Sequence, residues 1–170
     1  AYHDGGWVVC DTGRGNVVSL GAAGEVVEVV ISELESPTLL ASHGSELFVA
    51  TQGDGAIWDI TAGAAVLVAT LDGKPQQSTA TGTELYYASG DTIYRRVTDG
   101  FAPVVSGIDG VGGLALGDGF LYYSELGTTT SSNARLVRVG LDGSNAVTLI
   151  SQDVLQGALH VPAMGFSADG

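Results

Sequence analysis

Cysteine, positive charge and long apolar runs are scarce in this sequence, and each scarcity excludes a class of structure or partner. The single cysteine, Cys10, permits neither an intramolecular disulfide nor a cysteine-rich zinc site. No stretch reaches the roughly 18 consecutive apolar residues typical of a membrane helix, so we expect no membrane insertion. Hydrophobic residues nevertheless make up 45% of the chain, which is enough for a folded domain with a core.

Basic residues are so few that the chain carries a strong negative charge. Six lysines and arginines stand against 19 acidic residues, and the net charge is -13 at pH 7. The six are Arg14, Lys74, Arg95, Arg96, Arg135 and Arg138. They form no long basic run, so the protein should repel phosphate backbones and anionic membrane surfaces. We therefore expect no nucleic-acid partner, and we interpret the acidity as an aid to solubility.

Glycine is abundant, at 26 residues, or about twice its usual share of roughly 7%. It shows no collagen-like period, so it indicates many tight turns between short strands. The sequence also contains no long amphipathic helical stretch. Together these features favour an all-β fold.

One strand-like segment recurs four times, at roughly 40-residue intervals. The copies begin at Trp7 (WVVCDTG), Leu47 (LFVATQG), Leu85 (LYYASG) and Leu121 (LYYSELG), each after a turn-like cluster. Each copy is followed by a second strand, a turn, a third strand and then a strand of small residues; the turn contains Asp-Gly in two copies. Four short strands per repeat is the pattern of a β-propeller blade.

The small-residue strands favour a propeller over a β-sandwich. Examples are residues 38–41, 78–81 and 113–116, whose small side chains suit the crowded strands nearest a propeller axis. Larger residues would fill the space between adjacent sheets. A β-sandwich also has short strands but gives no four-fold self-match. We predict an all-β β-propeller of about four four-stranded blades.

The repeat units span approximately residues 3–42, 43–80, 81–116 and 117–162, and the start of a further blade falls at 163–170. Four blades lie at the low limit for closing a ring. We therefore expect either part of a larger ring or a ring closed jointly with another chain; two copies, for example, could form an eight-bladed ring with two-fold symmetry. The expected partners are a protein or additional propeller blades from the same or another chain.

The last unit carries a family resemblance. It contains Leu-Tyr-Tyr-Ser-Glu at 121–125, Arg-Leu-Val-Arg-Val at 135–139 and Leu-Asp-Gly-Ser at 141–144. This order resembles the YWTD repeat of lipoprotein-receptor-type propellers, with its Tyr-Trp-Thr-Asp strand, Ile-x-Arg strand and Leu-Asp-Gly-Ser turn. NHL-type and gluconolactonase-like propellers share the broader rhythm. The resemblance implies a propeller with more blades, protein or ligand binding, and a structural hydrogen-bonding role for Asp11 and Glu125.

Familiar catalytic and cofactor motifs are absent: the sequence has no nucleophile elbow, phosphate loop, zinc motif or dinucleotide fingerprint. Three histidines raise the alternative of a metal or acid–base site. His3 and His43 share a repeat position, so recurrence of a turn residue explains them without a ligand, and His160 lies in a loop. Cys10 ends an apolar strand and is interpreted as a small hydrophobe. We expect no catalytic, cofactor or metal-binding residues.

Two loops in the fourth unit break the rhythm of the repeat. One consists of Thr128, Thr129, Thr130, Ser131, Ser132 and Asn133, and the other contributes Val154, Leu155, Leu159 and His160. Insertions in repeat proteins map to loops, often on the binding face. These ten residues are the candidate interaction residues, with neutral surface variation as the alternative.

The function expected from the sequence is a non-enzymatic binding or scaffold module for a protein or another ligand. The family resemblance and the acidic surface suggest a location outside the cytoplasm: extracellular, periplasmic or at the cell surface. Two alternatives stay open. A propeller enzyme of lactonase or lyase type would place metal-binding groups at the central channel, and a structural subunit would assemble through incomplete blade edges.

Overall fold

The computed structural model describes residues 1–127 and 134–151, which form four separate four-stranded antiparallel sheets, here called blades 1 to 4. Blade 1 contains β1 (Tyr2–His3), β2 (Gly6–Asp11), β3 (Asn16–Leu20) and β4 (Val26–Ile31), and blade 2 contains β5 (Pro37–His43), β6 (Glu46–Thr51), β7 (Ala56–Asp59) and β8 (Val66–Thr70). Blade 3 contains β9 (Pro75–Ala80), β10 (Leu85–Ser89), β11 (Thr92–Val97) and β12 (Gly100–Val105), and blade 4 contains β13 (Val111–Gly117), β14 (Phe120–Glu125), β15 (Arg135–Gly140) and β16 (Val147–Ser151). A short 3-10 turn, η1 (Thr12–Arg14), follows β2, and no helix in the described part of the chain is long and apolar enough to cross a membrane. The prediction of an all-β chain with four four-stranded blades is confirmed.

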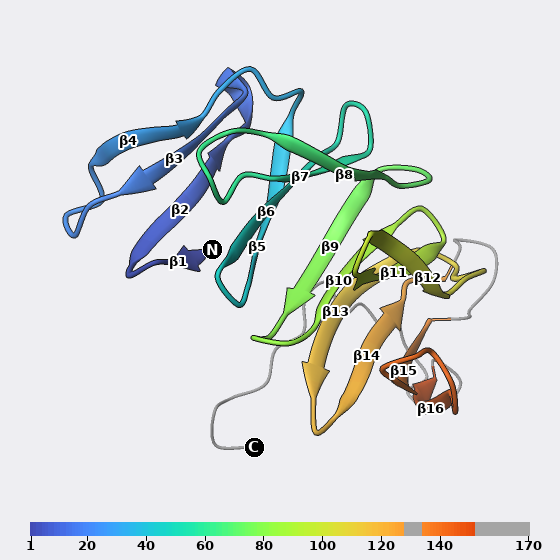
Figure 1. The fold of residues 1–170 in the computed structure, drawn as a ribbon. Coiled ribbons are helices and arrows are strands. Elements are labelled where there is room, and N and C mark those ends of the chain that lie inside the picture. Colours follow the sequence, from blue (N-terminus) through green and yellow to red (C-terminus); the bar gives the residue numbers. More distant parts are fainter. Residues whose placement is uncertain (128–133, 152–170) are drawn as a thin grey trace.

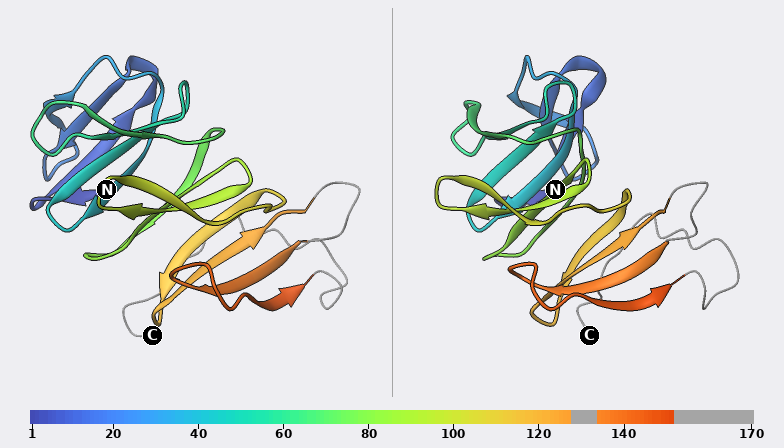
Figure 2. Two further views of the ribbon diagram at one scale, coloured as in Figure 1. Left: turned by 45° about the vertical axis from the view of Figure 1, so that its right-hand side comes forward. Right: turned by 90° about the vertical axis from the view of Figure 1, so that its right-hand side faces the viewer.

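The four blades follow one another along an arc (Figures 1 and 2). The first strand of each blade lies on the inside of the arc: β9 of blade 3 contacts both β5 of blade 2 and β13 of blade 4. Small residues permit this close approach, as with the buried Gly112, Gly113 and Ala115 of β13. Over the described residues the arc does not close into a ring, which agrees with the expectation of a partial propeller.

Blades 2 and 3 each present two apolar faces, one to each neighbouring blade. In β6, Leu47 and Val49 pack toward blade 1, whereas Phe48 and Ala50 pack toward blade 3, because successive side chains of a strand point to opposite faces. Blade 3 repeats the arrangement, with Tyr87 toward blade 2. The hydrophobic core is therefore a series of layers between neighbouring blades.

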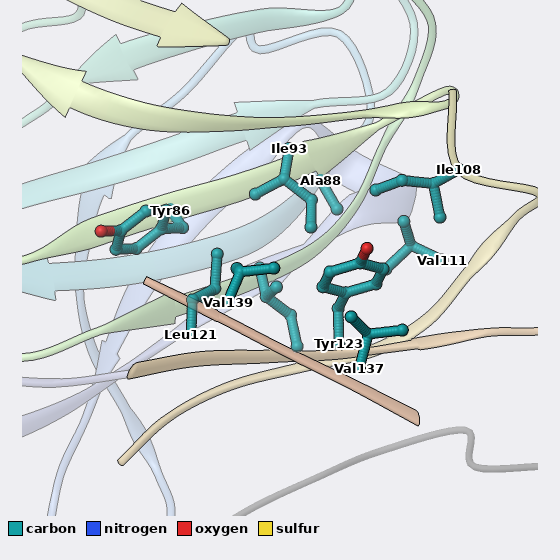
Figure 3. Close-up of a cluster of buried hydrophobic side chains, with 10 residues drawn as sticks. Tyr86, Ala88, Ile93, Ile108, Val111, Leu121, Tyr123, Val137 and Val139 are labelled. Carbon is teal, nitrogen blue, oxygen red and sulfur yellow. The ribbon is translucent and has the colours of Figure 1, made fainter. Parts of the chain in front are cut away.

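Figure 3 shows the layer between blades 3 and 4. Blade 3 contributes Tyr86, Ala88 and Ile93, and blade 4 contributes Leu121, Tyr123, Val137 and Val139. All of these side chains are at most 4% exposed, and burial of each large one stabilises the fold by about 1.5–3 kcal/mol. The hydroxyl of Tyr86 donates to the carbonyl oxygen of Leu141 at 2.7 Å, so the polar end of the ring also joins the two blades.

The four-stranded sheets and the sequence repeats do not begin at the same strand. Each repeat unit of the sequence begins near the second strand of a blade and ends with the small-residue strand. In the structure that strand pairs with the next copy, as β5 does with β6 and β9 with β10. The links at 32–36 and 71–74 therefore run from the last, outer strand of one blade to the first, inner strand of the next.

Tight turns join the first two strands of the blades. Asp4 and Gly5 have φ angles of 45° and 80° between β1 and β2, and Asp118 and Gly119 have 50° and 76° between β13 and β14. Two consecutive positive φ angles match the twist of a hairpin, and Asp-Gly tolerates them. The corresponding turns of blades 2 and 3, β5–β6 and β9–β10, border the site described next.

Candidate functional site

A groove opens between blades 2 and 3, beside the turns that join the first two strands of each blade. Its volume is about 490 Å³. It is lined by His43, Glu46, Thr83, Glu84, Arg95, Arg96, Val97 and Thr98. The β5–β6 turn forms one wall, and the β9–β10 turn with the end of β11 forms the other. The groove thus brings two of the chain's six basic residues together in an otherwise acidic protein.

Arg95 is fixed in the wall of the groove by Glu84. Its Nε and Nη2 atoms donate to the two carboxylate oxygens at 2.8 and 2.7 Å, which is a bidentate pair. The hydrogen bond to Glu84 raises the pKa of Arg95 above its ordinary value. Burial, and then the nearby carboxylate, raises the pKa of the Tyr86 hydroxyl, which lies 3.2 Å from Glu84. The charge of Arg95 is therefore already balanced.

Arg96 has no carboxylate within ion-pair distance in the described residues. Its guanidinium lies 5.5 and 5.9 Å from the ring centroids of Phe48 and Phe101. Its Nη1 donates to the carbonyl oxygens of Thr98 and Gly100 at 3.3 and 3.1 Å, and its Nε is buried with no hydrogen-bond partner. Rings and neutral carbonyls thus hold this cation in place without neutralising it.

The repeat shows that Arg96 occupies a packing position. In blades 1 and 4, the residues at the same place in the cross-strand pairing are Leu20 of β3 and Val139 of β15. In blade 2 the same place is held by Ile60, directly after β7. Ile60 and Val139 are 1% and 0% exposed. Residues that break a local packing rule tend to mark functional sites. The arginine at this position therefore marks the groove as the candidate site.

One acidic residue, Glu46, lies in the wall of the groove opposite the two arginines. Glu46 Oε2 lies 3.3 Å from His43 Nδ1, and the side chain of Glu46 is 40% exposed. The groove therefore offers Arg96 to a carboxylate and Glu46 to a cation. Within residues 1–127 and 134–151, no group of three or more His, Cys, Asp or Glu residues is placed to hold a metal ion.

A second hollow of about 240 Å³ lies on the other side of the β9–β10 turn, between blades 3 and 4. Leu116, Phe120 and Leu141 give it an apolar wall, and it shares Thr83 and Glu84 with the groove. The two hollows are therefore neighbours on one face, the first charged and the second apolar.

The ten loop residues proposed from the sequence fall outside the part of the chain that the structure describes. They are Thr128, Thr129, Thr130, Ser131, Ser132, Asn133, Val154, Leu155, Leu159 and His160. The other two histidines have separate partners: His3 Nδ1 lies 3.1 Å from Ser42 Oγ, and His43 pairs with Glu46. Of these two, His43 lines the groove and His3 does not.

The two acidic residues singled out by the family resemblance form ion pairs within their own blades. Glu125, only 5% exposed, accepts a hydrogen bond from Arg135 Nη2 at 2.8 Å, and Asp11 accepts one from Arg14 Nη1 at 2.9 Å. Cys10 is half-buried, and burial raises the pKa of its thiol to about 11. The thiol therefore stays protonated at neutral pH, as suits a packing residue.

The groove was not predicted from the sequence. The signal was present, because two adjacent arginines stand out among six basic residues and one of them falls in an otherwise aliphatic repeat position. What the sequence could not show is that the β5–β6 turn of the neighbouring blade lies opposite them.

No known protein family profile matches the chain, and no curated protein matches it. Similar solved structures exist. A chain of a nidogen–laminin complex aligns with a TM-score of 0.63 at 14% identity, over 82% of this chain and 60% of that chain. A gluconolactonase from Xanthomonas campestris aligns with a TM-score of 0.63 at 16% identity, over 84% of this chain and 58% of that chain.

BamB from Moraxella catarrhalis aligns with a TM-score of 0.60 at 17% identity, over 95% of this chain and 52% of that chain. Likeness at such low identity shows the fold alone, and that fold is a β-propeller. The chain spans less than two thirds of the length of each of these three proteins.

Proposed function

We propose that this propeller is a non-enzymatic binding module that recognises a protein partner through the groove between blades 2 and 3. The observation that carries the proposal is Arg96, an unneutralised guanidinium that is held on two aromatic rings where other blades carry aliphatic residues. Arginine and aromatic residues are enriched at protein interfaces, and an arginine held in advance loses little entropy on binding. The nidogen–laminin complex among the similar structures is consistent with this use of the fold.

The ligand that suits the groove is an extended peptide segment of mixed charge. A carboxylate would pair with the guanidinium of Arg96, and a neighbouring lysine or arginine would reach the exposed Glu46. A strongly acidic ligand is disfavoured, because the net charge of -13 repels it at long range. The volume of about 490 Å³ lies within the roughly 300–1,000 Å³ typical of ligand sites.

The test is binding of an array of fluorescent peptides that pair one acidic with one basic residue, measured for the protein and for Arg96→Leu. Leucine restores the aliphatic residue of the repeat, so we expect the fold to be retained and the affinity to fall by about tenfold or more. Arg14→Leu is the matched control: it removes the same charge from an exposed side chain in blade 1 and should bind as before. Equal binding by Arg96→Leu and the unaltered protein contradicts the proposal.

A lactonase-type enzyme is the second candidate, because gluconolactonases are among the similar structures. Metal analysis of natively purified protein separates the two functions. Peptide binding without a stoichiometric divalent ion supports the binding module. A stoichiometric ion together with lactone hydrolysis would replace it by the enzyme.

We also propose that the protein acts outside the cytoplasm, in line with its resemblance to lipoprotein-receptor-type propellers. Fractionation of native cells, with detection of the chain by mass spectrometry, tests this location. Recovery of the chain in the cytoplasmic fraction alone would contradict it.

A further inference from the structure

One face of blade 1 is apolar and exposed. Its exposed residues are Tyr2, Trp7, Val26 and Val29; Val9 and Leu20 between them are partly exposed, and Val18 is buried beneath its neighbours. Tyr2, Trp7, Val26 and Val29 are 57%, 60%, 61% and 52% exposed, and the rings of Tyr2 and Trp7 meet edge to face, with centroids 5.5 Å apart. The opposite face of the same sheet packs on blade 2 through Val8 and Val17. Contiguous exposed apolar residues of this kind mark an interaction surface.

The repeat identifies what covers this face in the other blades. Trp7 occupies the position of Leu47, Leu85 and Leu121, which are 2%, 0% and 0% exposed. Each of those leucines is buried in the layer between its own blade and the preceding one. Val9 similarly occupies the position of Val49, Tyr87 and Tyr123, which are 0%, 0% and 4% exposed. Blade 1 thus carries the same apolar positions as the blades that follow it, and no other sheet within residues 1–127 and 134–151 lies against them.

We propose that the exposed face of blade 1 packs against a further blade of the same propeller, carried by the same polypeptide. The face of that blade toward blade 1 would carry the same apolar pattern that blades 2 and 3 carry on the faces toward the blades that follow them. Its second strand would carry a bulky apolar residue and, two positions later, a small one, as in Phe48 and Ala50 of blade 2. A branched aliphatic residue would stand opposite the small one on the third strand, as Ile57 stands opposite Ala50.

Two observations favour this occupant over a second copy of the chain. Two copies would bring together two molecules of net charge -13, and the mutual repulsion opposes their association. The similar solved propellers also contain additional length within a single chain, since this chain covers only 58–60% of two of them. A further blade would add a fourth apolar layer like the three that already lie between blades, so it requires no new kind of contact.

The test is hydroxyl-radical footprinting with mass spectrometry, applied to the protein from its native source and to the 170-residue chain made alone. We expect a native mass above 17.2 kDa and a Trp7 modification rate lower by roughly tenfold or more in the native protein, since exposure should fall from 60% toward the 2% or less of its counterparts. Trp58, which lies between blades 1 and 2, is the internal control and should react equally in both.

A second measurement does not depend on footprinting. Trp7→Asp should leave the unfolding midpoint of the 170-residue chain unchanged, because the side chain is exposed there, and should lower the midpoint of the native protein. A native mass of 17.2 kDa, or a native protein in which Trp7 reacts as fast as in the isolated chain, would overturn the proposal. A concentration-dependent dimer of the 170-residue chain that protects Trp7 would assign the face to a second copy instead.

Discussion

Replacement of Gly143 by alanine tests the close approach of blade 4 to blade 3. Gly143 lies in the β15–β16 turn with φ of 82°, and a Cβ atom there would stand 1.8 Å from the carbonyl oxygen of Val104 in β12. Ordinary contact requires 3.4–4 Å, so the turn must retreat by well over an ångström. The retreat would break the hydrogen bond from the Tyr86 hydroxyl to Leu141 and loosen Leu141 from the layer between the blades.

The magnitude follows from these contacts. Alanine at positive φ costs about 1 kcal/mol, and loss of the hydrogen bond to Leu141 costs about 1 kcal/mol more, because the Tyr86 hydroxyl keeps the Glu84 carboxylate at 3.2 Å as a partner. With partial loss of packing, we expect Gly143→Ala to reduce the free energy of unfolding by about 2–4 kcal/mol, or to lower the Tm by roughly 10 °C. The assay is urea and thermal unfolding followed by circular dichroism.

Gly24 is the matched control, because it occupies the corresponding turn of blade 1. It has φ of 83° and nothing within 4 Å of an added Cβ atom. Gly24→Ala should therefore cost only the backbone contribution of about 1 kcal/mol. Equal destabilisation by the two substitutions would refute the inferred approach of the β15–β16 turn to β12.

Two further predictions concern Cys10 and Glu84. Burial raises the pKa of Cys10 from 9.0 to about 11. Its thiol should therefore react with a disulfide reagent at pH 8 about 100-fold more slowly in the folded chain than in urea. Equal rates in the two conditions would contradict the burial of the thiol. Glu84→Gln removes the carboxylate that binds both Nε and Nη2 of Arg95 and should reduce the free energy of unfolding by about 1 kcal/mol, since the partly exposed arginine is screened by solvent. The exposed Glu28 is its control, and Glu28→Gln should stay within about 0.5 kcal/mol of the unaltered protein; a loss as large as that of Glu84→Gln would show that the Arg95 pair adds nothing.

The sequence predicts the blades well because each level of the pattern repeats. The segments that begin at Trp7, Leu47, Leu85 and Leu121 all form the second strand of a sheet. Their alternating side chains pack toward the two neighbouring blades, as expected for strands with two buried faces. The partial propeller also follows from the sequence, because the number of repeats is countable.

The grouping of strands into sheets is harder to predict. A repeat can be cut at any point along its length, and only hydrogen bonding decides that β5 pairs with β6 rather than with the strands before it. Periodicity carries no information about that choice.

The candidate site depends on contacts between blades, which the sequence shows only indirectly. Arg96 could be singled out because it replaces an aliphatic residue of the repeat. Its stacking on Phe48, which lies in the preceding blade, and the proximity of Glu46 follow only from the arc. The unusual loops attracted attention as insertions, but their residues at 128–133 and 154–160 lie outside the described part of the chain.

The measurement that tests the proposed binding site most directly is an NMR titration of the isotope-labelled chain with the best-binding mixed-charge peptide. We predict that the amide shifts concentrate at residues 43–46, 83–84 and 95–98, and that Arg96→Leu abolishes them. Shifts confined to residues 128–133 or 154–160, and unaffected by Arg96→Leu, would contradict the proposed groove and assign recognition to the loops.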